Sequence, residues 1–233
     1  MKNFYFFIVT VGFFLTSCTS TKTIKFTQKP NEVQTTDVLS AFLSKSKNPK
    51  VVLRVKETSN NVTDKENNDY LYNAIENQLM ASGFVVRDRQ LFNQIIGNNE
   101  NNLNYENLNK KSDTDLIIEL TKLDRSVLYE TNKYYDAKGN EKADQFNGPF
   151  KEYGATVEFK VVLIKNNQFA GLYDFNYTPC IDGCTVAMSL KEISENMRKR
   201  KKMGVQIYEG VEKNALEEFI KSATRNLVQE MRK

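Results

Sequence analysis

Residues 37–120 alternate short apolar runs with longer stretches in which apolar residues recur every three or four positions. The clearest stretch places Leu71, Ile75 and Leu79 at four-residue spacing, and Gly83 follows where a helix would end. The pattern predicts a helix at 38–43 capped by Asp37, a strand at 51–55, a helix at 71–82, a strand at 84–86, a helix at 91–96 ended by Gly97, and a strand at 116–120. Such alternation is typical of an α/β fold.

An antiparallel hairpin is predicted further along the chain. Residues 157–164 alternate in the way that places one face of a strand in a core, and residues 169–177 return with their aromatic residues on one face. Asn166 and Asn167 suit the turn between them, because Asn tolerates the left-handed backbone that tight hairpins need. Residues 126–129 are expected to extend the strand that precedes the hairpin.

The chain ends in a predicted long helix. Residues 216–231 carry one apolar stripe, with Asn214 as the expected N-cap and Glu217 as its partner three residues on. Together the elements predict a single α/β domain over residues 37–233, of two or three layers. Its mixed sheet would follow the order β-α-β-α-β, then an antiparallel hairpin and the C-terminal helix.

The N-terminal segment differs from the rest of the chain. Lys2 precedes an almost unbroken apolar run from Phe4 to Leu15, which predicts a secretory signal peptide over residues 1–17. A transmembrane helix is the alternative, although the run is shorter than the roughly 20 residues that span a bilayer. Residues 18–36 are rich in Thr, Lys and Gln and are expected to form a flexible tether.

The signal ends in Leu15-Thr16-Ser17-Cys18, which resembles the lipobox of bacterial lipoproteins. The resemblance implies cleavage before Cys18, a lipid on its sulfur and an acyl chain on its new amino end. Several acyl chains anchor a protein stably where one chain would bind only marginally. A lipid anchor in the bacterial outer membrane, with the protein facing the periplasm, is therefore expected.

The residue types restrict the chemistry. Histidine is absent, which excludes Ser-His-Asp and Cys-His catalysis and histidine-ligated zinc. We find no nucleophile with a base, no phosphate-binding glycine loop and no metal-ligand set, so the sequence predicts no enzyme, cofactor or metal. Cys180 and Cys184 flank Ile181-Asp182-Gly183. In an oxidising compartment they are expected to form a disulfide, with two reduced thiols as the alternative.

Charge gives two weaker signals. The formal net charge is +4 over the whole chain, which argues neither for nor against an anionic partner. A basic run could contact an anionic surface, or it could be the solvated end of a helix; it comprises Arg198, Lys199, Arg200, Lys201 and Lys202. Nucleic acid is not an expected partner, because the signal peptide predicts export.

Residues 131–153 form a polar excursion between the last predicted strand and the hairpin. Long segments of this kind inside compact domains are often functional. Four aromatic residues in it could form an interaction loop, or they could fold back over the sheet edge: Tyr134, Tyr135, Phe146 and Phe150.

Three acidic residues stand at the start of the strand at 116–120. Asp115 and Glu119 point to the same side of a strand, but they would lie about 13 Å apart at roughly 3.3 Å per residue. That distance is too long for an acid–base pair. We expect Asp113, Asp115 and Glu119 to be solvent-facing charges.

Residues 50–178 resemble the CsgG-like and LpoB-like envelope lipoproteins. The resemblance is carried by the helix–strand–helix segment at 79–96, by the strand at 113–120 and by the hairpin at 156–177. It implies a lipid-anchored periplasmic protein, with ring-like self-association on the CsgG side and a monomeric adaptor on the LpoB side. CsgG-type channels add two membrane-spanning hairpins per subunit, and residues 131–153 lack the required lipid-facing alternation.

The sequence therefore predicts a lipid-anchored accessory protein of the outer membrane that binds envelope proteins, and self-association into a homo-oligomer is compatible with this interpretation. One alternative is an oligomeric secretion-channel subunit of the CsgG type. A second is a histidine-free hydrolase of envelope polymers, which would need two carboxylates within about 5 to 10 Å.

Overall fold

The computed structural model describes residues 21–55, 68–96, 113–144, 149–166, 168–187 and 210–233. The predicted signal peptide, Cys18 and the basic run at 198–202 lie outside these residues. So do Phe146, Gly97 and Asn167.

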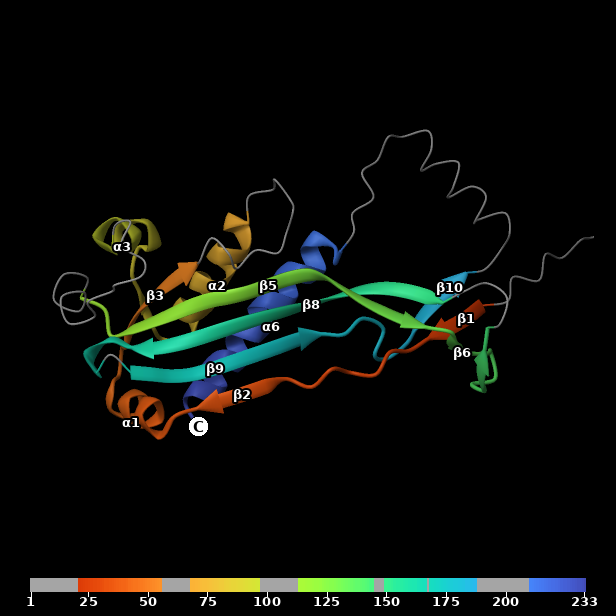
Figure 1. Ribbon diagram of the computed structural model, residues 1–233, viewed down its shortest axis with the longest axis horizontal. Helices are drawn as coiled ribbons and strands as arrows, with labels where there is room; N and C mark the ends of the chain where they lie inside the picture. Colours follow the sequence, from red (N-terminus) through yellow and green to blue (C-terminus); the bar gives the residue numbers. More distant parts are fainter. Residues whose placement is uncertain (1–20, 56–67, 97–112, 145–148, 167, 188–209) are drawn as a thin grey trace, which may run out of the picture.

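A six-stranded mixed sheet forms the centre of the protein (Figure 1). Its order is β2-β9-β8-β5-β3-β4, from β2 (Glu32–Thr35), β9 (Gln168–Tyr177), β8 (Phe150–Leu163), β5 (Leu116–Thr131), β3 (Lys50–Val55) and β4 (Val85–Val86). Strand β3 runs parallel to β4 and β5, and the remaining pairs are antiparallel. The predicted mixed α/β fold is thus observed, with its elements following one another along the chain from β3 to the C-terminal helix as expected.

Helices cover both faces of this sheet, but unequally. Three of them bury their apolar sides in the main core on one face: α1 (Asp37–Lys45), α2 (Asp69–Ala81) and α6 (Lys213–Met231). On the other face α3 (Arg89–Ile96) packs Phe92 against Val52, Ile117 and Val162 at one end of the sheet. Apolar residues therefore point both ways along β3 and β5, which explains their nearly continuous hydrophobic runs.

The helix ends are partly as expected. After α2, Gly83 adopts a φ of +87° and its N–H donates to the carbonyl of Met80, while the N–H of Phe84 donates to that of Leu79. These two bonds form a Schellman motif. The predicted caps of two other helices are wrong. Asn214 lies inside α6, which begins after Glu212, and Asp37 is the first residue of α1 rather than its cap.

The hairpin turns where the pattern predicts, in a different form. A 3-10 turn at Ile164–Asn166 follows β8 and leads into β9. The two strands of the hairpin, β8 and β9, are longer than expected, and so is β5. Residues 126–129 continue β5 as predicted, and the strand runs on to Thr131 beside the first residues of β8.

Residues 132–144 of the polar excursion predicted at 131–153 do leave the central sheet, whereas residues 150–153 belong to β8. Beyond the end of β9, β5 and β8 continue as a two-stranded ribbon towards a second sheet at the far end of the molecule (Figure 1). This distal sheet has the order β10-β1-β6-β7, from β10 (Cys184–Ala187), β1 (Thr21–Ile24), β6 (Lys133–Tyr135) and β7 (Glu141–Ala143).

The tether predicted at 18–36 is also wrong from Thr21 onward. Strand β1 pairs with β10 and β6 in the distal sheet, and β2 pairs with β9 at the edge of the central sheet. Ile24 and Phe26 are buried. Strands are therefore present from Thr21 onward, three residues after Cys18, and not only from residue 37.

Candidate functional site

Three of the four aromatic residues considered for an interaction loop lie in or next to the distal sheet. Tyr134 and Tyr135 lie on β6, and Phe150 begins β8. The rings of Tyr134 and Phe150 meet edge to face with centroids 6.5 Å apart, and the Lys22 Nζ lies 4.4 Å from the Tyr134 centroid. Successive side chains of a strand point to opposite faces. Tyr134 therefore packs against Phe150 and Lys22 on one face of the distal sheet, and Tyr135 points to the opposite face.

Tyr135 lines a cavity of about 520 Å³ on that second surface. Phe26, Tyr129 and Ile181 contribute apolar or aromatic groups to it, and Lys25 and Lys133 contribute cations. The Phe26 and Tyr129 rings contact edge to face at 5.7 Å, and the Lys25 Nζ lies 5.4 Å from the Tyr135 centroid. The cavity therefore offers aromatic surface with charges at its margin.

Glu141 organises the polar side of this cavity. Its carboxylate accepts a hydrogen bond from the Tyr135 hydroxyl at 3.1 Å and pairs with the Lys133 Nζ at 2.8 Å. The bonds from Lys133 and Tyr135 lower the pKa of Glu141. The bond to Glu141 raises the pKa of both Lys133 and Tyr135. These three groups therefore keep their ordinary charge states at neutral pH.

A disulfide loop forms one edge of the same cavity. The sulfur atoms of Cys180 and Cys184 lie 1.95 Å apart, and the loop presents Ile181 with 42% of its surface exposed. Cys184 pairs with Ile24 of β1. At Gly183, which has a φ of +109°, a Cβ atom would lie 2.7 Å from the Thr23 side chain, so the loop fits closely against β1. The exposed Ile181 is thus held in place.

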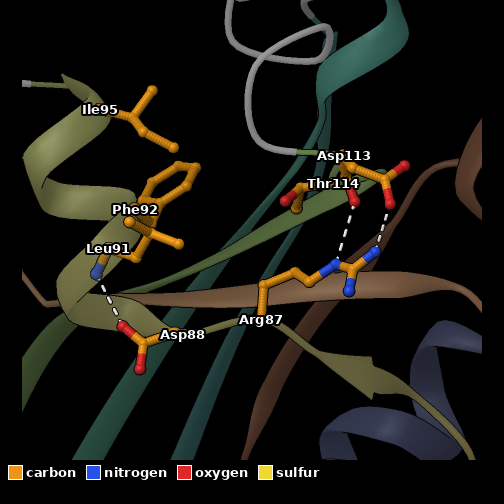
Figure 2. Close-up of a pocket in the computed structure, with 7 residues that line it drawn as sticks. All are labelled: Arg87, Asp88, Leu91, Phe92, Ile95, Asp113 and Thr114. Atoms are coloured by element: carbon orange, nitrogen blue, oxygen red, sulfur yellow. Dashed lines mark hydrogen bonds and ion pairs between the residues drawn. The ribbon is translucent and has the colours of Figure 1, made fainter.

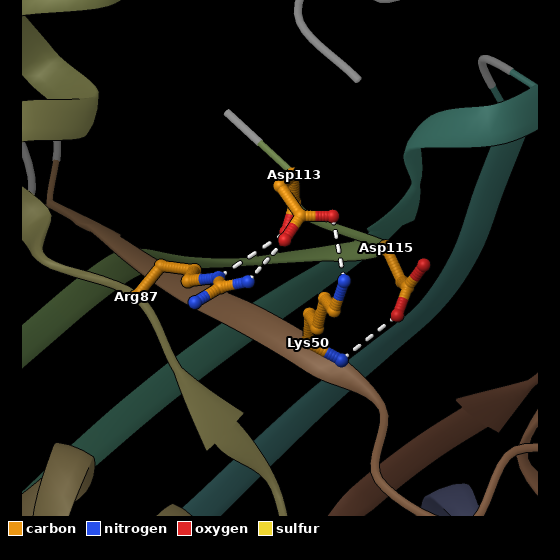
Figure 3. Close-up of polar contacts among 4 residues, drawn as sticks. All are labelled: Lys50, Arg87, Asp113 and Asp115. Atoms are coloured by element: carbon orange, nitrogen blue, oxygen red, sulfur yellow. Dashed lines mark hydrogen bonds and ion pairs between the residues drawn. The ribbon is translucent and has the colours of Figure 1, made fainter. Parts of the chain in front are cut away.

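At the other end of the molecule, Asp113 links Lys50, at the start of β3, to Arg87, which follows β4 (Figure 3). Its carboxylate pairs with the Lys50 Nζ at 2.6 Å and with the Arg87 guanidinium, whose Nε also donates to the Asp113 carbonyl at 3.2 Å. The hydrogen bond from Lys50, together with the charge of Arg87, lowers the pKa of Asp113. Asp113 also has a left-handed φ of 48°, which Asp tolerates better than most residues.

Asp115 joins the starts of two strands in this cluster through hydrogen bonds to the backbone of Lys50. Its carboxylate accepts the backbone N–H of Lys50 at 2.8 Å, and its own N–H donates to the Lys50 carbonyl at 2.9 Å. These bonds fix the start of β3 against the start of β5. Asp113 is exposed as expected, but the sequence analysis missed its partners Lys50 and Arg87, which lie 63 and 26 residues away in the chain.

A pocket of about 250 Å³ opens beside this cluster, between α3 and the start of β5 (Figure 2). Leu91, Phe92 and Ile95 form its apolar wall on α3, and Arg87 reaches across to Asp113 on the opposite side. Leu91 is 57% exposed. Asp88 caps α3, because its carboxylate accepts the backbone N–H of Leu91 at 2.7 Å.

Glu119 contradicts the expectation of a solvent-facing charge. It is 1% exposed and pairs with the Arg54 guanidinium at 2.6 Å and the Lys160 Nζ at 3.5 Å. Arg54, Glu119 and Lys160 lie in register on β3, β5 and β8. The three side chains form a charged row across the sheet, and a buried carboxylate paired in this way is a structural group.

The described part of the chain contains no group of three or more Asp, Glu or Cys side chains arranged to hold a metal ion. Within the same residues, no helix has both the length and the apolar character needed to cross a membrane.

Comparisons with known proteins identify no family. No protein-family model matches the chain, and no curated protein matches it. Among solved structures, the alignments described next have low TM-scores. The L103M variant of PelC from Paraburkholderia phytofirmans, a dodecamer, aligns with a TM-score of 0.44 and 10% identity over 87% of this chain and 98% of PelC.

Two further structures align less well. The PelC dodecamer in another crystal form gives a TM-score of 0.39 and 8% identity over the same shares of the two chains. A PDZ domain protein from Parabacteroides distasonis gives 0.28 and 13% identity, over 82% of this chain and 38% of that protein. At TM-scores below 0.5 these likenesses assign no function, and the resemblance to CsgG-like lipoproteins stays a prediction.

Proposed function

We propose that this protein is a lipid-anchored accessory protein of the bacterial outer membrane that binds another envelope protein through its distal sheet. The lipobox-like ending at Cys18 supports the anchor. The cavity beside Tyr135 supports the binding role, since aromatic residues with a polar tip are enriched in protein interfaces.

The position of β1 is the observation that carries this proposal. Thr21 begins β1, and three residues of fully extended chain span at most roughly 11 Å. A lipid on Cys18 would therefore hold the distal sheet close to the membrane surface. The central sheet and its helices would then project from it, and a partner in the same membrane would meet the distal sheet first.

The chemistry of the cavity suits a protein partner. Ile181 offers an exposed apolar group on a loop closed by a disulfide, so little conformational freedom is lost when it is covered. Tyr135 and Tyr129 offer aromatic surface, and Lys25, Lys133 and Glu141 surround it with charges. Apolar anchors within a polar rim are the usual arrangement of an interaction hot spot.

Site-specific photo-crosslinking in living cells tests the proposal. A photoreactive amino acid replaces Ile181 or Lys133 in the distal sheet and, as controls, Met80 or Glu218 on the helical layer. We expect a discrete crosslinked product of higher mass from the two distal positions and none from the controls. Equal products from all four positions would contradict a specific distal interface, and a product at twice the mass of the chain would make a second copy the partner.

The anchor needs its own measurement. Mass spectrometry of the N-terminal peptide should show an acylated Cys18, and Cys18→Ala should move the protein from the membrane fraction to the soluble fraction. An unmodified Cys18 would remove the anchor while leaving the crosslinking result to decide the interface.

A further inference from the structure

The pocket beside α3 has two unlike walls. One is apolar and consists of Leu91, Phe92 and Ile95, while the other carries the ion pair of Arg87 and Asp113 (Figure 2). Leu91 keeps 57% of its surface exposed, and the Asp113 side chain keeps 64%. A ligand that fits both walls needs an apolar part next to a strongly polar part.

Both members of the ion pair retain capacity for a ligand. The bonds to Asp113 use two of the five N–H groups of an arginine side chain, so the guanidinium can bind Asp113 and a second oxyanion together. Each carboxylate oxygen has two lone pairs, so Asp113 can accept a further donor beside Lys50 and Arg87. A donor and an acceptor, each charged, thus lie side by side at the pocket.

The pocket lining carries charges of both signs. Arg87 contributes a cation and Asp88 and Asp113 contribute anions, while Lys50 pairs with Asp113 from outside the lining. A simple anion would meet Asp113, and a simple cation would meet Arg87, so neither is favoured. A ligand that carries both charges close together would match Arg87 with its anionic group and Asp113 with its cationic group.

We propose that this pocket binds a free α-amino acid with an apolar side chain. Its carboxylate would bind Arg87, its ammonium group would bind Asp113, and its side chain would lie against Leu91 and Ile95. The volume is adequate, because a cavity of about 150 Å³ already admits benzene, and this pocket provides about 250 Å³. This inference is independent of the distal interface and of the lipid anchor.

Equilibrium dialysis of the purified full-length protein with radiolabelled L-leucine tests the proposal. For an open pocket and a ligand of about nine heavy atoms, we expect saturable binding with a Kd on the order of 1 mM. Two leucine analogues test the recognition of each charge. N-acetyl-leucine lacks the ammonium group and leucinamide lacks the carboxylate, so each should bind at least about tenfold more weakly.

Two variants locate the site. Arg87→Gln removes the anion-binding group, and Leu91→Gln makes the apolar wall polar without a poor helix former. Each should weaken leucine binding at least about tenfold. Met80→Gln is the matched control, because Met80 is an equally exposed apolar residue (51%) on α2, away from the pocket, and its variant should bind as the wild type does.

Three results would overturn the proposal. The first is no saturable leucine binding up to about 20 mM. The second is equal affinity for leucine and either analogue, which would mean that one charge is not recognised. The third is unchanged binding by a folded Leu91→Gln variant, which would place the leucine elsewhere on the protein.

Discussion

Arg54 and Glu119 face each other on the parallel strands β3 and β5, with 2.6 Å between the guanidinium and the carboxylate. Both are almost completely buried, and Lys160 approaches the same carboxylate from β8. Removing charges from water is costly, so such a pair is tolerated only when each member keeps its partner. The register of three strands is tied to this contact.

Loss of Arg54 alone should be strongly destabilising. Arg54→Met removes the nearest cation from the buried Glu119 carboxylate, and we expect the free energy of unfolding to fall by about 3 kcal/mol. Urea denaturation at neutral pH measures this. The double variant Arg54→Met with Glu119→Leu removes both charges and should recover most of the loss. A double variant as unstable as the single one would show that packing, rather than the unpaired charge, causes the effect.

The Asp113 contacts should make stability depend on acidic pH. The pKa of Asp113 is lowered in the folded protein, so its charge stabilises the fold above the ordinary value of 3.8, and this stabilisation is lost as the pH falls through the lowered pKa. Asp113→Asn keeps a residue that tolerates the left-handed backbone but removes the charge. Its melting temperature should lie below that of the wild type at pH 7, and the two should converge at low pH.

Asp182→Asn is the matched control for that pH series, because Asp182 is an exposed aspartate in the disulfide loop. Its difference from the wild type should be small at pH 7. If Asp113→Asn behaves in the same way, the contacts with Lys50 and Arg87 contribute nothing measurable.

Gly154 should be intolerant of any side chain. It lies where the ribbon leaves the central sheet, and a Cβ atom there would lie 2.3 Å from the Tyr177 carbonyl oxygen and 2.5 Å from the Tyr129 ring. Gly154→Ala should cost about 1 to 3 kcal/mol of unfolding free energy in urea denaturation. Gly139→Asn is the control, since no atom lies within 4 Å of a Cβ there and Asn tolerates its φ of +80°. Equal losses for both variants would argue against crowding at Gly154.

The disulfide should contribute a modest stabilisation. It closes a short loop, with four residues of sequence separation, and the entropy of closing such a loop corresponds to about 2 kcal/mol at most. Replacing both Cys180 and Cys184 with Ser should therefore lower the melting temperature by several degrees, about 8 °C or less. A reductant should lower that of the wild type similarly and leave the variant unchanged, and a reductant-insensitive wild type would show that the bond does not contribute.

The central α/β fold was predictable because its residues combine local and global signals. Leu71, Ile75 and Leu79 form the buried side of α2 as their spacing indicates, and Gly83 ends the helix with the backbone that glycine favours. Leu116 to Leu120 are all buried, so their strand has a strong hydrophobic signal.

The distal sheet was not predictable in the same way. Glu141, Lys142 and Ala143 of β7 are all exposed, so that strand has no hydrophobic alternation. Strand β1 has one fully buried apolar side chain, Ile24, within a stretch rich in Thr and Lys. Such strands are specified by their neighbours, which come from distant parts of the chain.

The candidate sites show the same division. Cys180 and Cys184 attract attention because of their residue type and spacing, whereas the Arg87–Asp113 pair requires two strand ends to meet. Glu119 was misjudged because its partner Arg54 lies 65 residues earlier in the chain. Only the register of β3 against β5 reveals that contact.

The unbroken course of β5 and β8 also has a mechanical consequence. Their ribbon joins the distal sheet to strands that are bonded to β3 on one side and to β9 on the other. Backbone hydrogen bonds in antiparallel pairs lie across the strand direction, and those of parallel pairs are slanted to it. A pull on the distal sheet along the ribbon would therefore load the β3–β5 and β8–β9 ladders in shear. The hydrogen bonds of each ladder would share the force instead of breaking one at a time.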